Sequence, residues 1–284
     1  RSGGPDRFPA KPIPEGGVFA LIQSDYDAFR AQLRTRETDG LPLCLQCGDR
    51  TDGSLLVGRD GWGLSLATRD FWQNYAKGYE VSRSSVRLCP WPGDAPSPLS
   101  FRPEDVVAPV FAKRLCYSSR GYRIETGHNY ASYTYGTGTK PLGVSKTHEF
   151  VLDFSTAPSE DRARAVQRLL DDPPLLIVPP DYVSATEALG RIAPCNSTSY
   201  PMEEKAFKAM LARLEYGKPE HRHWGLVNFG ESYQSTDSDG EIGVYRTYQN
   251  AGYGIVNDFY RGFLRSGDRD WFRYAVRRTR HNRD

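Results

Sequence analysis

The chain has 284 residues, enough for one large domain or two ordinary ones. Hydrophobic residues make up 38% and charged residues 25%, which is the composition of a globular protein and excludes a largely disordered chain. The 37 basic and 35 acidic side chains leave a net charge of +2, so the molecule as a whole attracts no polyanion and any anion site must be local. No run approaches the ~20 apolar residues that cross a membrane, so no membrane partner is expected.

The N-terminal residues 1–17 contain four Pro and four Gly, which predicts a mobile lead-in. They lack an initiating Met and the apolar core of a signal peptide, so we interpret the chain as a processed product or a fragment. Its five cysteines cannot all pair within one chain. Cys44 and Cys47 form a single CxxC without a second ligand pair nearby, so we predict that they hold no metal.

Residues 18–157 are predicted to form β structure. Apolar and polar side chains alternate, with the period of half-buried strands, in the runs 64–67, 86–91 and 148–154. The segment 25–36 fits a short helix or an irregular excursion equally well. Short strands separated by turn clusters favour a β-sandwich over a fold of alternating strands and helices.

The apolar pattern changes to a helical period after residue 158. Ser159 is an N-cap type of residue followed by two acids, so it is expected to begin a helix. Further helices are predicted over 202–216, over 251–265 and from 270 to the C-terminus. The last two would form an αα-hairpin, whose outer face we expect to be covered by a further domain or a second chain.

Three stretches, in order and spacing, carry a family resemblance. The first is Gly63-Leu-Ser-Leu-Ala-Thr-Arg-Asp-Phe-Trp-Gln73, followed by Leu88-Cys-Pro-Trp-Pro92. The second is Gly143-Val-Ser-Lys-Thr-His-Glu149, and the third joins Trp224-Gly225, Asn228-Phe-Gly-Glu231, Tyr248-Gln-Asn250 and Tyr253. Together they resemble the exo-rhamnogalacturonan lyases, although Gly254 stands where the family pattern has an acid.

The resemblance implies an α+β chain, with an antiparallel β-sandwich (a supersandwich) followed by helices of an incomplete α/α toroid. The expected domains are a lead-in at 1–17, the sandwich at 18–157, a linker with a short helix at 158–200 and the toroid's opening helices at 201–284. It also implies a secreted polysaccharide lyase that cleaves an acidic rhamnose–uronate polymer of the pectin type by β-elimination, without a cofactor.

A uronate lyase must neutralise a carboxylate, remove the adjacent proton and protonate the leaving oxygen. Arg suits the first task, and His, Tyr or Lys suits the other two. The catalytic candidates are His223, His148, Lys146 and Tyr253. Lys146 and His148 would face the same side of a strand, where they could reach an acidic sugar or simply form its polar face. His223 could equally belong to a basic surface turn.

The expected substrate-binding residues are Trp224, Asn228, Glu231 and Asn250. Asn and Glu bind sugar hydroxyls, and Trp offers a flat apolar face with a polar edge. The alternative is that these residues cap and support the helical hairpin. A glycoside hydrolase would need two carboxylates facing one cleft, and Glu231 has no evident second. A non-catalytic carbohydrate-binding or structural fragment is the other alternative.

Residues 261–284 hold eight Arg and three Asp. Such a basic tail could bind nucleic acid. The Arg residues recur every three to four positions, however, which is typical of the solvated face of a helix. We therefore expect no nucleic-acid partner.

Overall fold

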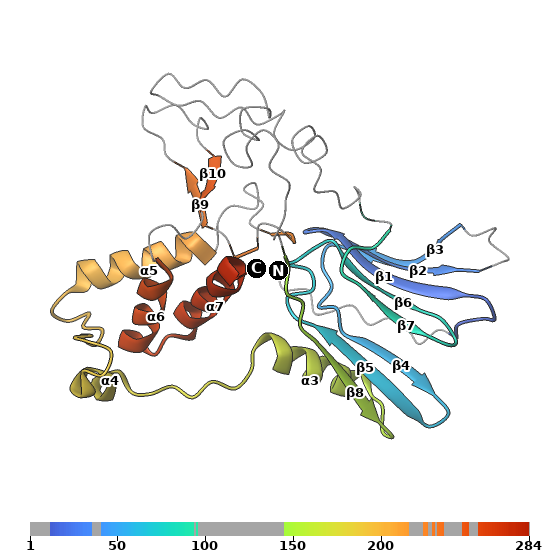
Figure 1. Cartoon of the computed structure of the whole chain (residues 1–284), viewed down its shortest axis with the longest axis horizontal. Coiled ribbons are helices and arrows are strands. Elements are labelled where there is room, and N and C mark those ends of the chain that lie inside the picture. Colours follow the sequence, from blue (N-terminus) through green and yellow to red (C-terminus); the bar gives the residue numbers. More distant parts are fainter. Residues whose placement is uncertain are drawn as a thin grey trace, which may run out of the picture. The chain divides into compact units, whose positions relative to one another are not determined.

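The computed structural model describes residues 12–35, 41–93, 95, 145–215, 224–226, 229–230, 232–235, 246–249 and 255–283 (Figure 1). The chain divides into two compact units. The sandwich unit comprises Arg1–Pro98, Thr147–Leu175 and Trp224–Phe229, and the helical unit comprises Leu99–Lys146, Leu176–His223 and Gly230–Asp284.

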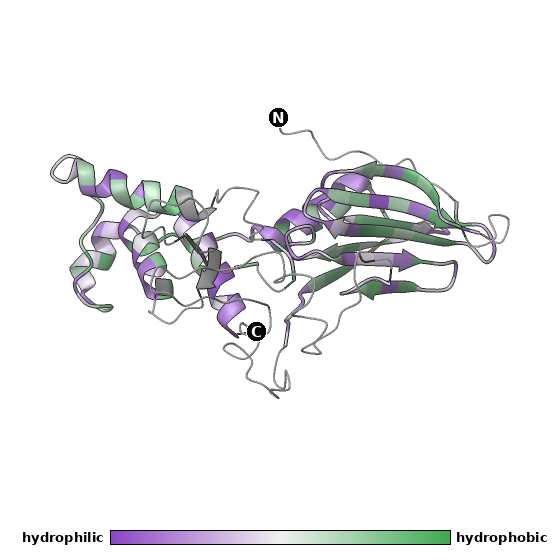
Figure 2. Cartoon of the chain, turned by 90° about the horizontal axis from the view of Figure 1, so that it is seen from above, coloured by the Kyte–Doolittle hydropathy of each residue, from purple (hydrophilic) through white to green (hydrophobic). Residues whose placement is uncertain are grey.

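The sandwich unit contains two antiparallel sheets. The five-stranded sheet has the order β3 (Leu43–Gly48), β2 (Ala28–Arg34), β1 (Val18–Asp25), β6 (Lys77–Val81) and β7 (Val86–Cys89). The three-stranded sheet has the order β4 (Leu55–Arg59), β5 (Trp62–Thr68) and β8 (Phe150–Ser155). Leu21 and Tyr79 of the first sheet and Leu66 of the second share one buried core. Hydrophobic residues dominate these strands (Figure 2), and the predicted β-sandwich is confirmed.

The sequence suggested a short helix or an irregular excursion over 25–36, and this prediction is wrong for the described residues 25–35. The segment supplies the turn and second strand of a hairpin, in which Val18 pairs with Arg34 and Asp25 with Ala28. Phe29 is 5% exposed and belongs to the core. Pairing with β1 on one side and β3 on the other decides this structure, and local propensity says little about such pairing.

Helix α3 (Glu160–Asp171) packs on the three-stranded sheet and begins, as predicted, at the N-cap residue Ser159. The pairing of β4 with β5 stops at Leu66, so Thr68 has no β4 partner. The amide of Gln167 replaces that partner, because its Nε2 donates to Thr68 O at 2.9 Å while its Oε1 accepts from Thr68 N at 3.2 Å. Gln167 is 1% exposed, so α3 satisfies the end of β5 without water.

Cys44 and Cys47 form a disulfide within β3, with their Cα atoms 7.1 Å apart. The ladder between β2 and β3 is bulged here, since Ala31 pairs with Gln46 and Gln32 with Cys44. An extra residue in one strand shifts the side chains that follow to the other face, so two cysteines three positions apart reach the same side. Cys89 and Cys195 are free thiols.

The helical unit contains α4 (Pro180–Thr186), α5 (Pro201–Glu215), α6 (Ile255–Ser266), α7 (Arg269–Arg283) and a hairpin of β9 (Ser232–Ser235) with β10 (Arg246–Gln249). Helices α5, α6 and α7 were predicted, whereas α4 and the hairpin were not. Gly267, with φ +69°, turns α6 into α7, and its N–H donates to Phe263 O at 2.7 Å. Phe259 and Trp271 lie in the core of the helical pair. None of the described helices is long and apolar enough to cross a membrane.

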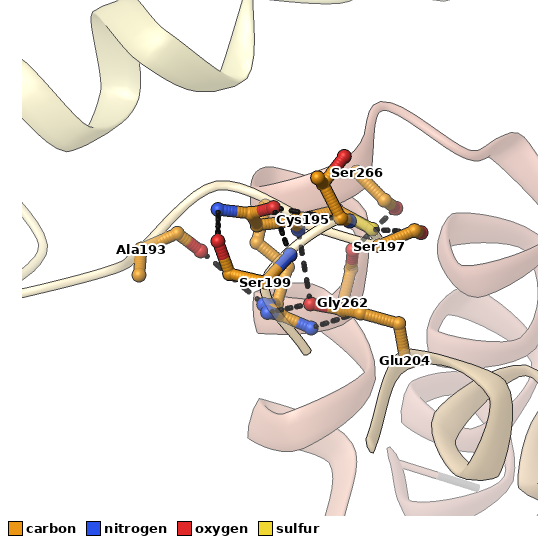
Figure 3. A network of polar contacts seen from close by, with 10 residues as sticks. Ala193, Cys195, Ser197, Ser199, Glu204, Gly262 and Ser266 are labelled. Atoms are coloured by element: carbon orange, nitrogen blue, oxygen red, sulfur yellow. Dashed lines mark hydrogen bonds and ion pairs between the residues drawn. The ribbon is translucent and has the colours of Figure 1, made fainter. Parts of the chain in front are cut away.

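A partly buried ion pair connects residues 193–199 to helices α5 and α6 (Figure 3). The Arg265 guanidinium donates to Glu204 at 2.6 and 2.9 Å and to Ala193 O at 3.3 Å. Glu204 also accepts from Asn196 N at 3.2 Å. The hydrogen bonds from Arg265 lower the pKa of Glu204 to about 2. The hydrogen-bond partners of the Glu204 carboxylate include the backbone N–H of Asn196 and the side chain of Arg265. Glu204 therefore holds two segments of the chain together, which is a structural role.

Asp171 ends α3 with a carboxylate that lies against protein groups. Its Oδ1 accepts from Asp70 N at 2.8 Å and its Oδ2 from Gln167 Nε2 at 2.7 Å. The residue as a whole keeps contact with solvent, yet burial of the carboxylate raises its pKa to about 6, against a usual 3.8. Within that interval the folded protein holds a proton that the unfolded chain has lost.

We expect the contribution of Asp171 to stability to fall as the pH rises from about 4 to about 6, because the unfolded state binds fewer protons there. Asp171→Asn should remove this part of the slope, measured as the free energy of unfolding in urea at several pH values. Asp153→Asn is the control of opposite sign. The hydrogen bond from Arg162 lowers the pKa of Asp153, so its contribution is lost only below about 3.8. Equal slopes in wild type and Asp171→Asn would contradict the prediction.

Candidate functional site

The turn between β5 and β6 presents an aromatic surface residue on a buried anchor. Phe71 is 1% exposed and its ring lies 5.0 Å from that of Tyr79, which fixes the turn to the core. Asn74 N donates to Asp70 O at 3.0 Å and closes the turn. Trp72 follows the anchor directly and is half-buried. Because Phe71 is buried in the core, the backbone of the adjacent Trp72 has a defined position.

Trp224 reaches this turn from far along the chain. Gly225 N donates to Gln73 O at 2.6 Å and Leu226 N to Tyr75 O at 2.7 Å, so the segment runs along the turn backbone. The ring of Trp224 lies 4.9 Å from that of Trp72. Gly225 has φ +107°, and a Cβ there would lie 3.3 Å from the Tyr75 ring. The close approach and the left-handed backbone both require glycine at this position.

Arg50 covers Trp72 from the loop between β3 and β4. Its guanidinium carbon lies 4.1 Å from the centre of a Trp72 ring, and its Nε donates to Tyr26 O at 3.0 Å. Phe229, 6% exposed, stacks on Trp224 with ring centres 5.7 Å apart. We call these four residues, Arg50, Trp72, Trp224 and Phe229, the Trp72 cluster.

A buried amide fixes the backbone on both sides of Arg50. Gln23 is 0% exposed; its Nε2 donates to Asp49 O at 2.9 Å and its Oε1 accepts from Thr51 N at 3.0 Å. Gly53, with φ +80°, lies so close to Phe71 that a Cβ would overlap the ring. The loop that carries Arg50 and the turn that carries Trp72 are therefore packed as one body.

Of the eight residues predicted for the site, the structure brings one, Trp224, into the Trp72 cluster. His148 is half-buried and precedes Glu149, whose carbonyl accepts from Arg69 N at 2.9 Å and whose carboxylate pairs with Arg69 at 2.7 Å. Arg69 begins the turn that holds Trp72. Five of the eight, His223, Asn228, Glu231, Asn250 and Tyr253, lie outside the described residues.

Lys146 and His148 were expected to share a face of a strand, but neither residue lies in a strand. Strand β8 begins at Phe150, and residues 145–149 have no regular secondary structure. The β5–β8 ladder ends where Thr68 pairs with Phe150, because the β5 chain turns away after that residue. Lys146 is half-buried and is grouped with the helical unit.

Two members of the cluster were missed from the sequence. Trp72 lies inside the first family-like stretch, so its position could have been singled out there. Arg50 precedes the first family-like stretch, which begins at Gly63, and only tertiary contacts bring it to Trp72.

The Trp72 cluster has the chemistry of a binding site. Indole rings offer flat apolar faces with a polar edge, which suit the ring of a sugar, and arginine binds carboxylates in a forked geometry. Its side chains are indole, phenyl and guanidinium groups, and none of these is a general base at neutral pH. Among the described residues, no group of three side chains could hold a metal ion.

A family model described as the PcRGLX-like protein central beta sandwich domain matches residues 9–168. The match covers more than half of the 284 residues. The chain therefore belongs to this family, and the resemblance to exo-rhamnogalacturonan lyases is confirmed.

Two curated proteins are also similar to the chain. "Uncharacterized protein YetA" of Bacillus subtilis strain 168 is 25% identical over 281 residues, which cover 92% of this chain and 30% of that protein. A 3-methyl-2-oxobutanoate hydroxymethyltransferase of Pyrobaculum arsenaticum is 36% identical over 78 residues, which cover 28% of this chain and 30% of that protein. In both cases the match spans about a third of the relative's length.

The packing of Gly53 against Phe71 yields a test of how firmly the cluster is built. Gly53→Ala should lower the free energy of unfolding by about 2–5 kcal/mol, since it adds left-handed strain and overpacking. Gly58→Ala is the matched control, because Gly58 has no atom within 4 Å of an added Cβ; a change below about 1 kcal/mol is expected. Urea unfolding followed by tryptophan fluorescence measures both, and equal losses would show that Gly53 has no special role.

Proposed function

We propose that this chain belongs to a polysaccharide lyase that acts on an acidic rhamnose–uronate polymer by β-elimination. The family match over residues 9–168 supports the class of protein. The Trp72 cluster is the observation that carries the choice of substrate. It combines two aromatic rings with a guanidinium, which are the groups that a charged sugar needs.

The reaction assigns three tasks to the protein. A cation neutralises the uronate carboxylate, a base removes the proton next to it, and an acid protonates the glycosidic oxygen as it leaves. The electron pair of the broken carbon–hydrogen bond forms the carbon–carbon double bond. His223, His148, Lys146 and Tyr253 are the proposed proton-transfer residues. His148 is the one that precedes Glu149, whose partner Arg69 lies three residues before Trp72 in the sequence.

Trp224, Asn228, Glu231 and Asn250 are proposed to bind the sugar ring and its hydroxyls. Trp224 supports this assignment through its contact with Trp72. The proposed partners are the acidic polysaccharide and a further domain or second chain over the C-terminal helices. A secreted location follows from a substrate that lies outside cells.

Incubation with rhamnogalacturonan should release an unsaturated uronate, measured as a rise in ultraviolet absorbance. His148→Ala should lower the rate on the order of 10²-fold or more if His148 transfers a proton. Trp224→Ala should weaken binding about tenfold, a loss of about 1.4 kcal/mol.

His281→Ala is the control, because His281 lies in the last turn of α7. Circular dichroism of each variant checks the fold. Binding without product would support a carbohydrate-binding module instead of an enzyme. Neither binding nor product would contradict the proposal.

A further inference from the structure

We infer that Arg50 is the residue that anchors the uronate carboxylate and selects a charged polymer over a neutral one. The inference rests on the proposed function, since it assumes that the Trp72 cluster receives a sugar. It adds a specificity-determining residue that neither the family match nor the sequence pattern indicates.

No carboxylate of the described residues forms an ion pair with Arg50. Among the described residues of the sandwich unit, ion pairs with carboxylates are formed by Arg59, Arg69, Arg87, Arg162 and Arg164. Within the described part of the chain, Arg50 instead contacts a ring and a backbone carbonyl. A cation held without an anion next to two partly exposed indoles is suited to a ligand that brings its own anion.

The guanidinium is also held in one orientation. Its Cζ lies over the Trp72 ring at 4.1 Å, and its Nε donates to Tyr26 O at 3.0 Å, so two contacts limit the movement of the group. This leaves the two terminal nitrogens as the forked edge that binds a carboxylate with two parallel hydrogen bonds. A ligand then has little side-chain entropy to remove when it binds.

The backbone under Arg50 is equally constrained. Gln23 binds the residues on both sides of it, Asp49 and Thr51, from a fully buried position. The backbone that carries Arg50 is therefore held in one place, which limits the positions that its guanidinium can reach. A residue that recognises a ligand by its geometry needs this kind of support from the groups around it.

The position of the charge fits a single sugar unit. Arg50 and Trp224 both lie in contact distance of the Trp72 ring, at 4.1 and 4.9 Å between the relevant centres. A uronate that stacks on the indole surface would bring its carboxylate, one bond from the ring, toward the guanidinium. A neutral hexose could stack in the same way but would gain nothing from the cation.

The test compares two ligands and three variants of the whole chain by calorimetric titration. The ligands are rhamnogalacturonan oligosaccharides and the same oligosaccharides with their carboxylates reduced to alcohols. Arg50→Gln should weaken binding of the acidic ligand about tenfold and leave binding of the reduced ligand unchanged. Arg50→Lys should restore part of the loss, because it keeps the charge and loses the fork. Arg59→Gln, which changes an exposed arginine of the β4–β5 hairpin, should bind both ligands like wild type.

The outcomes separate the two proposals. If wild type binds the acidic ligand and Arg50→Gln binds it equally well, Arg50 is not the anchor although the proposed function stands. Equal losses for both ligands would also overturn the inference, because the effect would not depend on the carboxylate. If wild type binds neither ligand, the proposed function itself fails. Binding of the acidic ligand that weakens with salt in wild type but not in Arg50→Gln would support the anchor independently.

Discussion

The amide of Gln23 is the contact on which the candidate site depends. It lies fully buried in β1 and satisfies backbone groups on both sides of Arg50, so the loop between β3 and β4 has one defined path. Removing a buried partner leaves such groups unsatisfied, at a cost of about 1–3 kcal/mol each. Gln167 has the same role at the end of β5, where it replaces a missing strand for Thr68. Two buried amides thus complete the sandwich where its ladders stop, and the Trp72 turn lies between them in sequence.

The helical unit uses charge for the same purpose. The Arg265–Glu204 pair joins residues 193–199 to α5 and α6 through hydrogen bonds to backbone as well as between side chains. A partly buried pair of this kind specifies one arrangement more than it adds net stability, because desolvation offsets much of its attraction. Arg50 differs from Arg265 in this respect. Its cation has an aromatic face and a carbonyl for partners, so it can still bind an anion.

The family, the sandwich and the helices α3, α5, α6 and α7 could be predicted from the sequence because they depend on local signals. Period-two runs such as 64–67 indicate strands, and Ser159 indicates the start of a helix. The three family-like stretches, by their order and spacing, indicate the family. The structure of residues 25–35 could not be predicted, because pairing with the neighbouring strands, and not the local propensity of these residues, makes them part of a hairpin.

The sequence by itself determined the class of fold and placed Trp224 in the candidate site. Only the tertiary structure decided that Trp72 and Arg50 belong with it. These three residues come from separate connections, and backbone hydrogen bonds and glycine packing join them over long sequence distances. A residue's role in such a cluster depends on what lies across from it in space, and no periodic pattern along the chain records that.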